Sequence, residues 1–221
     1  MTGASRTASD RPAAAPRGLR RFTGPRPPRQ ERCELCTAPL ADGGHRHLVD
    51  TANRALACTC TPCALLFDRP GAAGGRFRTV PERYLADPDH GLDDSTWEAL
   101  GIPVGVAFLF RNSALDRTVA LCPSPAGATE SEPSPSAWRD VLRATRLAGT
   151  MEPDVEALLL RRTDGRTECY LAPVDVCYEL VGLMRLHWRG FDGGQQARAG
   201  LESVFDRVRA RARHVRKERM P

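Results

Sequence analysis

The sequence has no long hydrophobic run, no apolar leader and almost no lysine. The longest uncharged apolar run, residues 104–110, has the length of a strand and is far shorter than the roughly 20 residues of a membrane-spanning helix. We therefore expect no membrane span. The N-terminal arginines are not followed by an apolar segment, so we also expect no secretory signal and a cytoplasmic protein. Of the 32 basic residues only Lys217 is a lysine, which we interpret as a coding bias first and a binding signal second.

Recognisable catalytic patterns are missing too. The sequence contains no paired catalytic carboxylates, no nucleophilic triad and no dinucleotide fingerprint. The segment PSPAGATES, residues 123–131, has small residues that would let backbone amides approach an anion. It lacks the Gly-Lys-Ser/Thr of a phosphate-binding loop, and Ser124 lacks the glycines of a nucleophile elbow. We expect a non-catalytic protein, with an enzyme that uses the 123–131 loop through Ser124 and Thr129 as an alternative.

Charge is divided unevenly along the chain. Residues 1–32 carry eight arginines against two acidic residues, and residues 207–221 carry seven basic residues against Glu218. The segment between them, residues 33–206, has 17 basic and 24 acidic residues, a net charge of −7. A nucleic-acid-binding domain usually carries its positive charge on a folded face. Basic ends on an acidic body are more typical of solvated tails, so we do not expect a nucleic-acid partner.

The composition predicts four segments and a linker between the second and the third. Residues 1–30 are rich in Ala, Pro, Arg and Gly and cannot bury enough surface to fold, so we expect a disordered basic tail. Residues 31–69 hold a cysteine-rich module, and residues 70–76 form a glycine-containing linker. Residues 77–208 have the pattern of an α+β domain, and residues 209–221 form a basic C-terminal end.

Two hairpins and three longer helices are expected in the α+β domain. Strands over 104–111 and 118–122 flank one turn, and strands over 155–162 and 167–171 flank the strong turn signal Asp164-Gly165. Residues 123–136 are expected to form a loop. Helices are predicted over 137–147, over 175–188 and from about 194, the last burying Leu201, Val204, Phe205 and Val208. These elements predict a four-stranded antiparallel sheet with helices on one face.

The cysteines give the most specific signal. Cys33 and Cys36 form one C-x-x-C pair, and Cys60 and Cys63 form a second, with 23 residues between the pairs. Two such pairs can complete a tetrahedron of thiolates around one ion. The residues between them, 46–57, could form the hairpin of a zinc-ribbon-like module. Reduced cytosolic thiols in a cluster favour a metal over disulfides, so we expect Zn²⁺ as the cofactor.

The identity of the metal and the full ligand set stay open. A four-sulfur site suits iron as well as zinc. Rubredoxin-type iron sites usually have glycine after the second cysteine of each pair, where this sequence has Thr37 and Ala64. Cys58 is a fifth thiol that could replace Cys60, pack in a core or help to hold an iron–sulfur cluster. One of the two histidines His45 and His47 could also face the metal.

Three further cysteines lie outside the cluster. Cys122, Cys169 and Cys177 are each at least eight residues from any other thiol. A cysteine is more often a small buried residue than a nucleophile. We expect all three to be packed in the core.

Several motifs together resemble a known family. They are CELC, HRHLVD, CTCTPC followed by ALLFDR, IPVGVAFLFRNS, PSPAGATES, PDVEALL and CYELVGLMRLHWRGFDGG. They span about residues 31–195 and resemble a bacterial family of unknown activity whose genes recur beside those of nickel–iron hydrogenases, mainly in high-GC actinobacteria. The resemblance implies an accessory role in hydrogenase maturation, assembly or electron transfer. A hydrogenase subunit or a maturation factor is the partner implied. The leading expectation is a metal-binding accessory protein, and the alternative is a rubredoxin-like or iron–sulfur electron carrier.

Overall fold

The computed structural model describes residues 30–41, 44–69, 71–102, 104–124, 126–190 and 193–215. The chain divides into two units, residues 1–31 and residues 32–221, and the description below concerns the second. The tail predicted for residues 1–30 lies outside the described residues except for Gln30, as do the last six residues of the basic C-terminal end.

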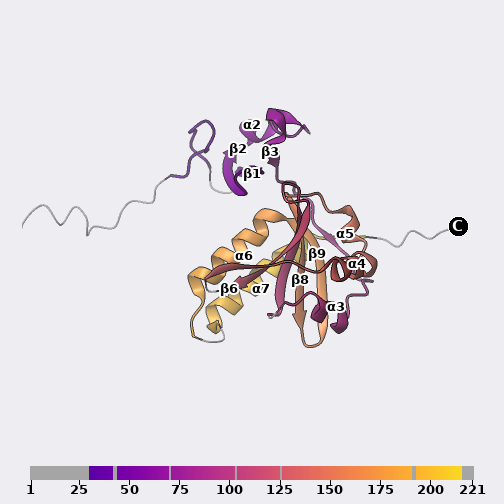
Figure 1. Cartoon of the computed structure of the whole chain (residues 1–221). Coiled ribbons are helices and arrows are strands. Elements are labelled where there is room, and N and C mark those ends of the chain that lie inside the picture. Colours follow the sequence, from indigo (N-terminus) through magenta and orange to yellow (C-terminus); the bar gives the residue numbers. More distant parts are fainter. Residues whose placement is uncertain are drawn as a thin grey trace, which may run out of the picture. The chain divides into compact units, whose positions relative to one another are not determined.

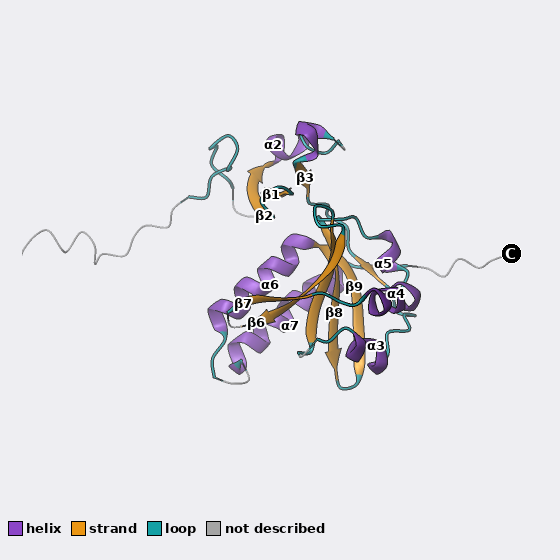
Figure 2. Cartoon of the chain, viewed as in Figure 1, coloured by secondary structure: helices purple, strands orange, loops and turns teal. Residues whose placement is uncertain are grey.

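Strands and helices make up most of the second unit (Figures 1 and 2). The strands are β1 (His45–Asp50), β2 (Ala55–Cys60), β3 (Phe77–Thr79), β4 (Leu85–Ala86), β5 (Val106–Asn112), β6 (Arg117–Ser124), β7 (Gly127–Ser131), β8 (Glu156–Thr163), β9 (Arg166–Pro173) and β10 (Arg213–His214). The helices are α2 (Thr61–Leu65), α3 (Asp94–Ala99), α4 (Pro135–Ala144), α5 (Leu147–Thr150), α6 (Val174–His187) and α7 (Gly194–Arg211), with a short 3-10 helix η1 (Ala72–Gly75).

A small sheet of order β2-β1-β3 carries the cysteine-rich segment. The turn between β1 and β2 is held by Asp50, whose carboxylate accepts hydrogen bonds from the backbone N–H groups of Ala52 and Asn53, both at 3.1 Å. This is the local side-chain-to-backbone bonding that favours Asp in turns. The third strand, β3, follows the expected 70–76 linker and pairs antiparallel with β1. The sheet that begins in the cysteine-rich segment therefore extends to Thr79.

The large sheet has seven strands in the order β10-β4-β9-β8-β5-β6-β7. Both predicted hairpins are confirmed, since β5 pairs with β6 and β8 pairs with β9, each antiparallel. The expectation of four strands is wrong, because β4, β7 and β10 extend the sheet at its edges. Only β10 runs parallel to its neighbour, β4. These edge strands are short or rich in small polar residues, so the sequence shows no period-2 apolar pattern there.

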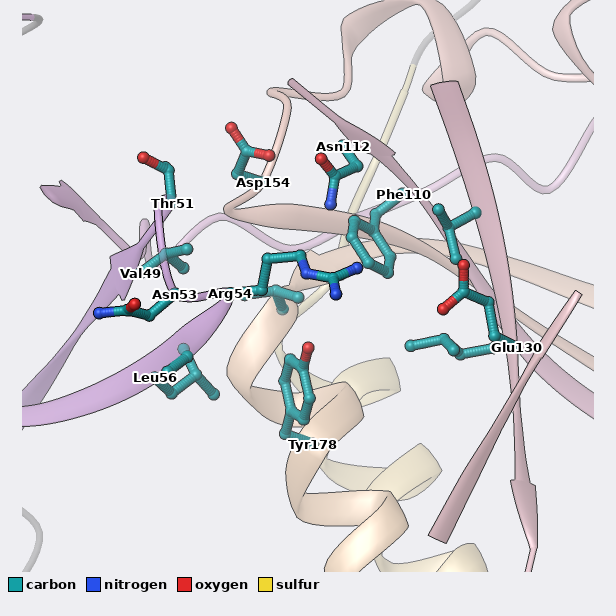
Figure 3. Close-up of a pocket in the computed structure, with 14 residues that line it drawn as sticks. Val49, Thr51, Asn53, Arg54, Leu56, Phe110, Asn112, Glu130, Asp154 and Tyr178 are labelled. Atoms are coloured by element: carbon teal, nitrogen blue, oxygen red, sulfur yellow. The ribbon is translucent and has the colours of Figure 1, made fainter. Parts of the chain in front are cut away.

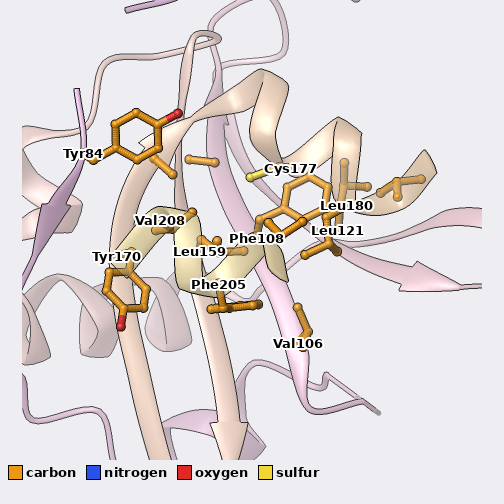
Figure 4. Packing of buried hydrophobic residues seen from close by; sticks show 14 of the residues in the cluster. Tyr84, Val106, Phe108, Leu121, Leu159, Tyr170, Cys177, Leu180, Phe205 and Val208 are labelled. Carbon is orange, nitrogen blue, oxygen red and sulfur yellow. The ribbon is translucent and has the colours of Figure 1, made fainter. Parts of the chain in front are cut away.

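Helices cover both faces of the large sheet, and the expectation of one covered face is wrong. On one face α6 and α7 pack on Leu159 and Tyr170 (Figure 4). On the other, α3, α4 and α5 cover Leu158 and Leu160. Successive side chains of a strand point to opposite faces, so a run such as Leu158–Leu159–Leu160 with every side chain buried requires cover on both sides. Such a run in the sequence indicates a sheet that is covered on both faces.

The C-terminal helix belongs to the core. Val204, Phe205 and Val208 are buried as predicted, while Leu201 is only partly buried. The helix continues past the expected end of the α+β domain at residue 208, and β10 follows it. Backbone N–H groups of Arg213 and Val215 donate to the carbonyls of Tyr84 and Ala86, at 3.0 and 2.9 Å. The chain up to Val215 thus takes part in the fold.

Candidate metal centre

The first C-x-x-C pair lies in a turn that precedes the small sheet. The backbone N–H of Thr37 donates to the carbonyl of Cys33 at 2.8 Å, and Thr37 has a left-handed backbone with φ of 62°. Glu34 fastens this turn to β2, since its N–H donates to the carbonyl of Cys58 at 2.9 Å and its carboxylate accepts from the N–H of Cys58 at 2.7 Å. Sequence reasoning missed this role of Glu34, because the partner is 24 residues away.

The second pair lies where β2 runs into a helix. Cys60 ends β2 and is the N-cap of α2, and Cys63 falls in the first turn of that helix. Pro62 suits this position because the first helical residues have no intrahelical use for an N–H. A β-hairpin and a helix start therefore bring the two pairs together, with the β1–β2 hairpin between them as predicted.

The four sulfurs form one cluster, which we call the four-thiol cluster: Cys33, Cys36, Cys60 and Cys63. All four sulfur atoms lie within 4.8 Å of one another. The Sγ atoms of Cys36 and Cys60 are 3.7 Å apart. A disulfide would require about 2.05 Å, whereas a tetrahedron with Zn–S bonds of about 2.3 Å separates its sulfurs by about 3.8 Å. The spacing fits four ligands around one ion.

The thiols of the four-thiol cluster differ in pKa. Burial would raise the pKa of Cys33, but backbone N–H groups, among them that of Cys60, outweigh it and lower that pKa to about 6. Hydrogen bonds between the sulfur of Cys63 and the thiols of Cys60 and Cys36 raise the pKa of Cys63 to about 12. Cys33 thus loses its proton far more readily than Cys63. A divalent cation would displace the remaining protons, because the thiolate is the form that binds a metal.

The two histidines and Cys58 lie outside the four-thiol cluster. Their donor atoms form a group of their own, also within 4.8 Å of one another, which we call the histidine–cysteine group: His45, His47 and Cys58. His45 is the cross-strand partner of Cys60, and His47 that of Cys58. Residues two apart on a strand share a face, so both histidines lie on one side of the small sheet. His47 Nδ1 is 2.7 Å from a carboxylate oxygen of Asp175 on α6.

The 123–131 segment is a hairpin and not a loop. Ser124 on β6 pairs with Gly127 on β7, and Cys122 pairs with Thr129. Backbone pairing with β6 stabilises these small polar residues as a strand, although their own preference for a strand is weak. This pairing uses backbone amides that an anion-binding loop would need.

A separate polar cavity of about 290 Å³ lies at the β1–β2 turn (Figure 3). Arg54, with a left-handed φ of 52°, extends its guanidinium into this cavity between Phe110 and Tyr178. Glu130 of β7 also lines it. The lining combines the guanidinium of Arg54, the phenol of Tyr178 and the carboxylates of Glu130 and Asp154.

The remaining cysteines are buried in the large-sheet body, as predicted. Cys122, Cys169 and Cys177 have at most 4% of their surface exposed. Burial raises the pKa of Cys169 to about 12 and also raises that of Cys177. Such thiols stay protonated at neutral pH and pack as small apolar groups.

Fold and site together define the class: an α+β protein with antiparallel sheets and a zinc-ribbon-like cluster of four cysteines. A family model described as a family of unknown function (DUF5947) matches residues 32–212, and the chain belongs to this family. No curated protein and no solved structure matches the chain. Among the described residues, no helix is both long and apolar enough to cross a membrane.

Proposed function

We propose that this chain is a non-catalytic accessory protein whose four-thiol cluster holds one structural zinc ion. The observation that carries the proposal is the set of four sulfurs within 4.8 Å, with one pair at 3.7 Å. Four protein ligands close the coordination shell, whereas catalytic zinc sites keep a position open for water or substrate. The chemistry of the bound ion is then to neutralise the thiolates and tie the two C-x-x-C pairs together. The thiols must stay reduced for this role, which favours a cytoplasmic location.

The ion would stabilise the fold of the small sheet. Few large side chains are buried there, chiefly Leu40, Leu48 and Val49. A segment of this size buries too little apolar surface to hold its shape alone and usually needs a metal or disulfides. Zinc bound by four cysteines supplies that folding free energy directly. We therefore expect loss of the metal to unfold the cysteine-rich module, residues 31–69, together with β3 of the same sheet, before the large sheet.

Hydrogenase maturation or assembly is the proposed process, and it rests on the sequence resemblance described above. The partner is then a hydrogenase subunit or a maturation factor. Co-purification from a hydrogenase-producing host tests this step. We expect a hydrogenase component to be retained by the full-length protein and lost when the module is unfolded by Cys36→Ala. Unchanged hydrogenase activity in a deletion strain would contradict the accessory role.

Metal analysis of anaerobically purified full-length protein tests the proposed site. We expect Cys36→Ala to bind one zinc ion fewer than the natural chain, and Cys122→Ala to bind as many as the natural chain. The matched control removes a thiol that is buried in β6, away from the cluster. A circular dichroism spectrum of each variant shows whether the large sheet is still folded. Full zinc content in Cys36→Ala would contradict the ligand assignment.

An electron carrier with iron is the second candidate, and one observation favours it. Thr37 adopts the left-handed backbone that glycine supplies after the second cysteine in rubredoxin-type turns. The lack of glycine therefore does not prevent the iron-type turn in the first C-x-x-C pair. The second pair, at the start of α2, has a helical backbone instead. A coloured protein that bleaches on reduction would support iron, and a colourless protein from iron-replete anaerobic cells would contradict it.

A further inference from the structure

Beside the four-thiol cluster, the small sheet carries a second set of metal-binding side chains. His45 and His47 on β1 and Cys58 on β2 are brought together by the antiparallel register, in which His47 faces Cys58 directly. The two imidazole centroids are 4.8 Å apart with an interplanar angle of 85°. All three donor atoms lie within 4.8 Å of one another.

We propose that the histidine–cysteine group is a second metal site, distinct from the four-thiol cluster, with one coordination position open. Two imidazoles and a thiolate suit a borderline divalent transition-metal ion such as zinc. In a tetrahedral zinc site the nitrogens are about 3.4 Å apart and a nitrogen and a sulfur about 3.6 Å apart, given bonds of about 2.0 and 2.3 Å. Since all three donor atoms lie within 4.8 Å of one another, they need to approach by at most about 1.4 Å to reach these separations.

Asp175 supplies the outer support that such a site requires. Its carboxylate lies 2.7 Å from Nδ1 of His47, so Nε2 of the same ring is left to bind the ion. A carboxylate that accepts from the second ring nitrogen fixes the tautomer and the orientation of a metal-binding histidine. Asp175 is 128 residues from His47 and lies in the first turn of α6. It is a positioning residue in this site and not a ligand.

The open position faces a cavity. The histidine–cysteine group lines a hollow of about 680 Å³ together with residues of α6 and α7. Among the other lining residues are Tyr84 and Arg211, whose guanidinium carbon lies 4.2 Å above the phenol ring. Three protein ligands beside an open cavity are the arrangement in which a bound ion exchanges its fourth ligand. The four-thiol cluster, with its closed set of ligands, cannot do this.

The experiment counts ions on the full-length protein by equilibrium dialysis against buffered free Zn²⁺ under anaerobic conditions. We expect two ions on the natural chain and one on His47→Ala and on Cys58→Ala. His214→Ala is the matched control, because His214 is an exposed histidine of β10, and it should retain two ions. Asp175→Asn should keep the second ion but weaken its binding by about 10–100-fold.

Stepwise loading with Co²⁺ on the natural chain gives a second readout that requires no substitution. The later equivalent should show thiolate-to-cobalt absorption of about one quarter of that of the first, since it has one Co–S bond and not four. A single ion that is retained in His47→Ala and Cys58→Ala overturns the second site and leaves the zinc proposal intact. A single ion that these variants lose also overturns it, because the group then belongs to the first site. No bound ion at all overturns both proposals.

Discussion

Truncation of Phe205 to alanine tests whether the C-terminal helix is part of the core or an appendage for a partner. Phe205 is fully buried on α7. Its ring packs against that of Tyr170, with centroids 6.3 Å apart. The guanidinium carbon of Arg161 lies 5.0 Å over the same ring, and Arg161 is held in place by Glu202 at 3.0 Å. The Phe205→Ala variant removes both contacts of the ring, with Tyr170 and with Arg161, and leaves a cavity between the helix and the sheet.

The expected loss is large compared with the stability of the domain. Truncation of a buried phenylalanine to alanine costs about 3–5 kcal/mol, and loss of the cation–π contact adds about 0.5–2 kcal/mol. A typical domain has a free energy of unfolding of about 5–15 kcal/mol. With a urea dependence of about 2 kcal/mol per molar, a loss of about 4 kcal/mol lowers the unfolding midpoint by about 2 M.

Urea unfolding of zinc-loaded protein, followed by tryptophan fluorescence, measures this shift. Gln196→Ala is the matched control, because Gln196 is exposed on the same helix. Its free energy of unfolding should stay within about 0.5 kcal/mol of that of the natural chain. A loss below about 1 kcal/mol for Phe205→Ala would refute the assignment of α7 to the core.

Three further predictions concern single side chains. Arg83→Met should lower the free energy of unfolding by about 2–3 kcal/mol, because its loss leaves the charge of the fully buried Glu156 unpaired. The Arg83 guanidinium contacts that carboxylate at 2.7 and 2.5 Å. Adding Glu156→Gln should recover most of the lost free energy, as measured by urea unfolding. Hydrogen bonds from Arg76 hold the pKa of Asp50 at about 2, against an ordinary value of 3.8. The natural chain should therefore have a higher free energy of unfolding than Asp50→Asn above about pH 4, and this difference should disappear toward pH 2. A difference that grows on acidification would contradict this assignment. Cys169 should remain unmodified by iodoacetamide in the native protein at pH 8, as read by mass spectrometry of its peptide, because burial raises its pKa to about 12.

Local sequence patterns predicted much of the fold. The Asp164-Gly165 turn joins β8 and β9. Such a turn needs positive φ at both residues, here 51° at Asp164 and 73° at Gly165, and Asp-Gly is a pair that adopts these angles. The two C-x-x-C pairs likewise predicted one cluster, since each turn fixes two sulfurs at short range. Neither inference depended on knowing where the rest of the chain lies.

Other features depended on contacts between distant residues. Gly127–Ser131 has a weak strand preference of its own and becomes β7 because β6 offers unpaired backbone groups. Cover on both faces of the large sheet was signalled by continuous runs of apolar residues such as Val106–Leu109 and Leu158–Leu160, which a strand buried on one side would not have.

By itself the sequence determined the α+β class, the hairpins and the four-thiol cluster, because each follows from interactions between residues that are near in the chain or of special chemistry. Only the tertiary structure decided that the donor atoms of His45, His47 and Cys58 form a group apart from that cluster. Strand register brings His47 opposite Cys58, but it also brings His45 opposite Cys60, where the chain leaves β2 and enters α2. It also brought Asp175 to His47 across 128 residues. No local rule relates those two positions, because their contact arises from the packing of α6 against the small sheet.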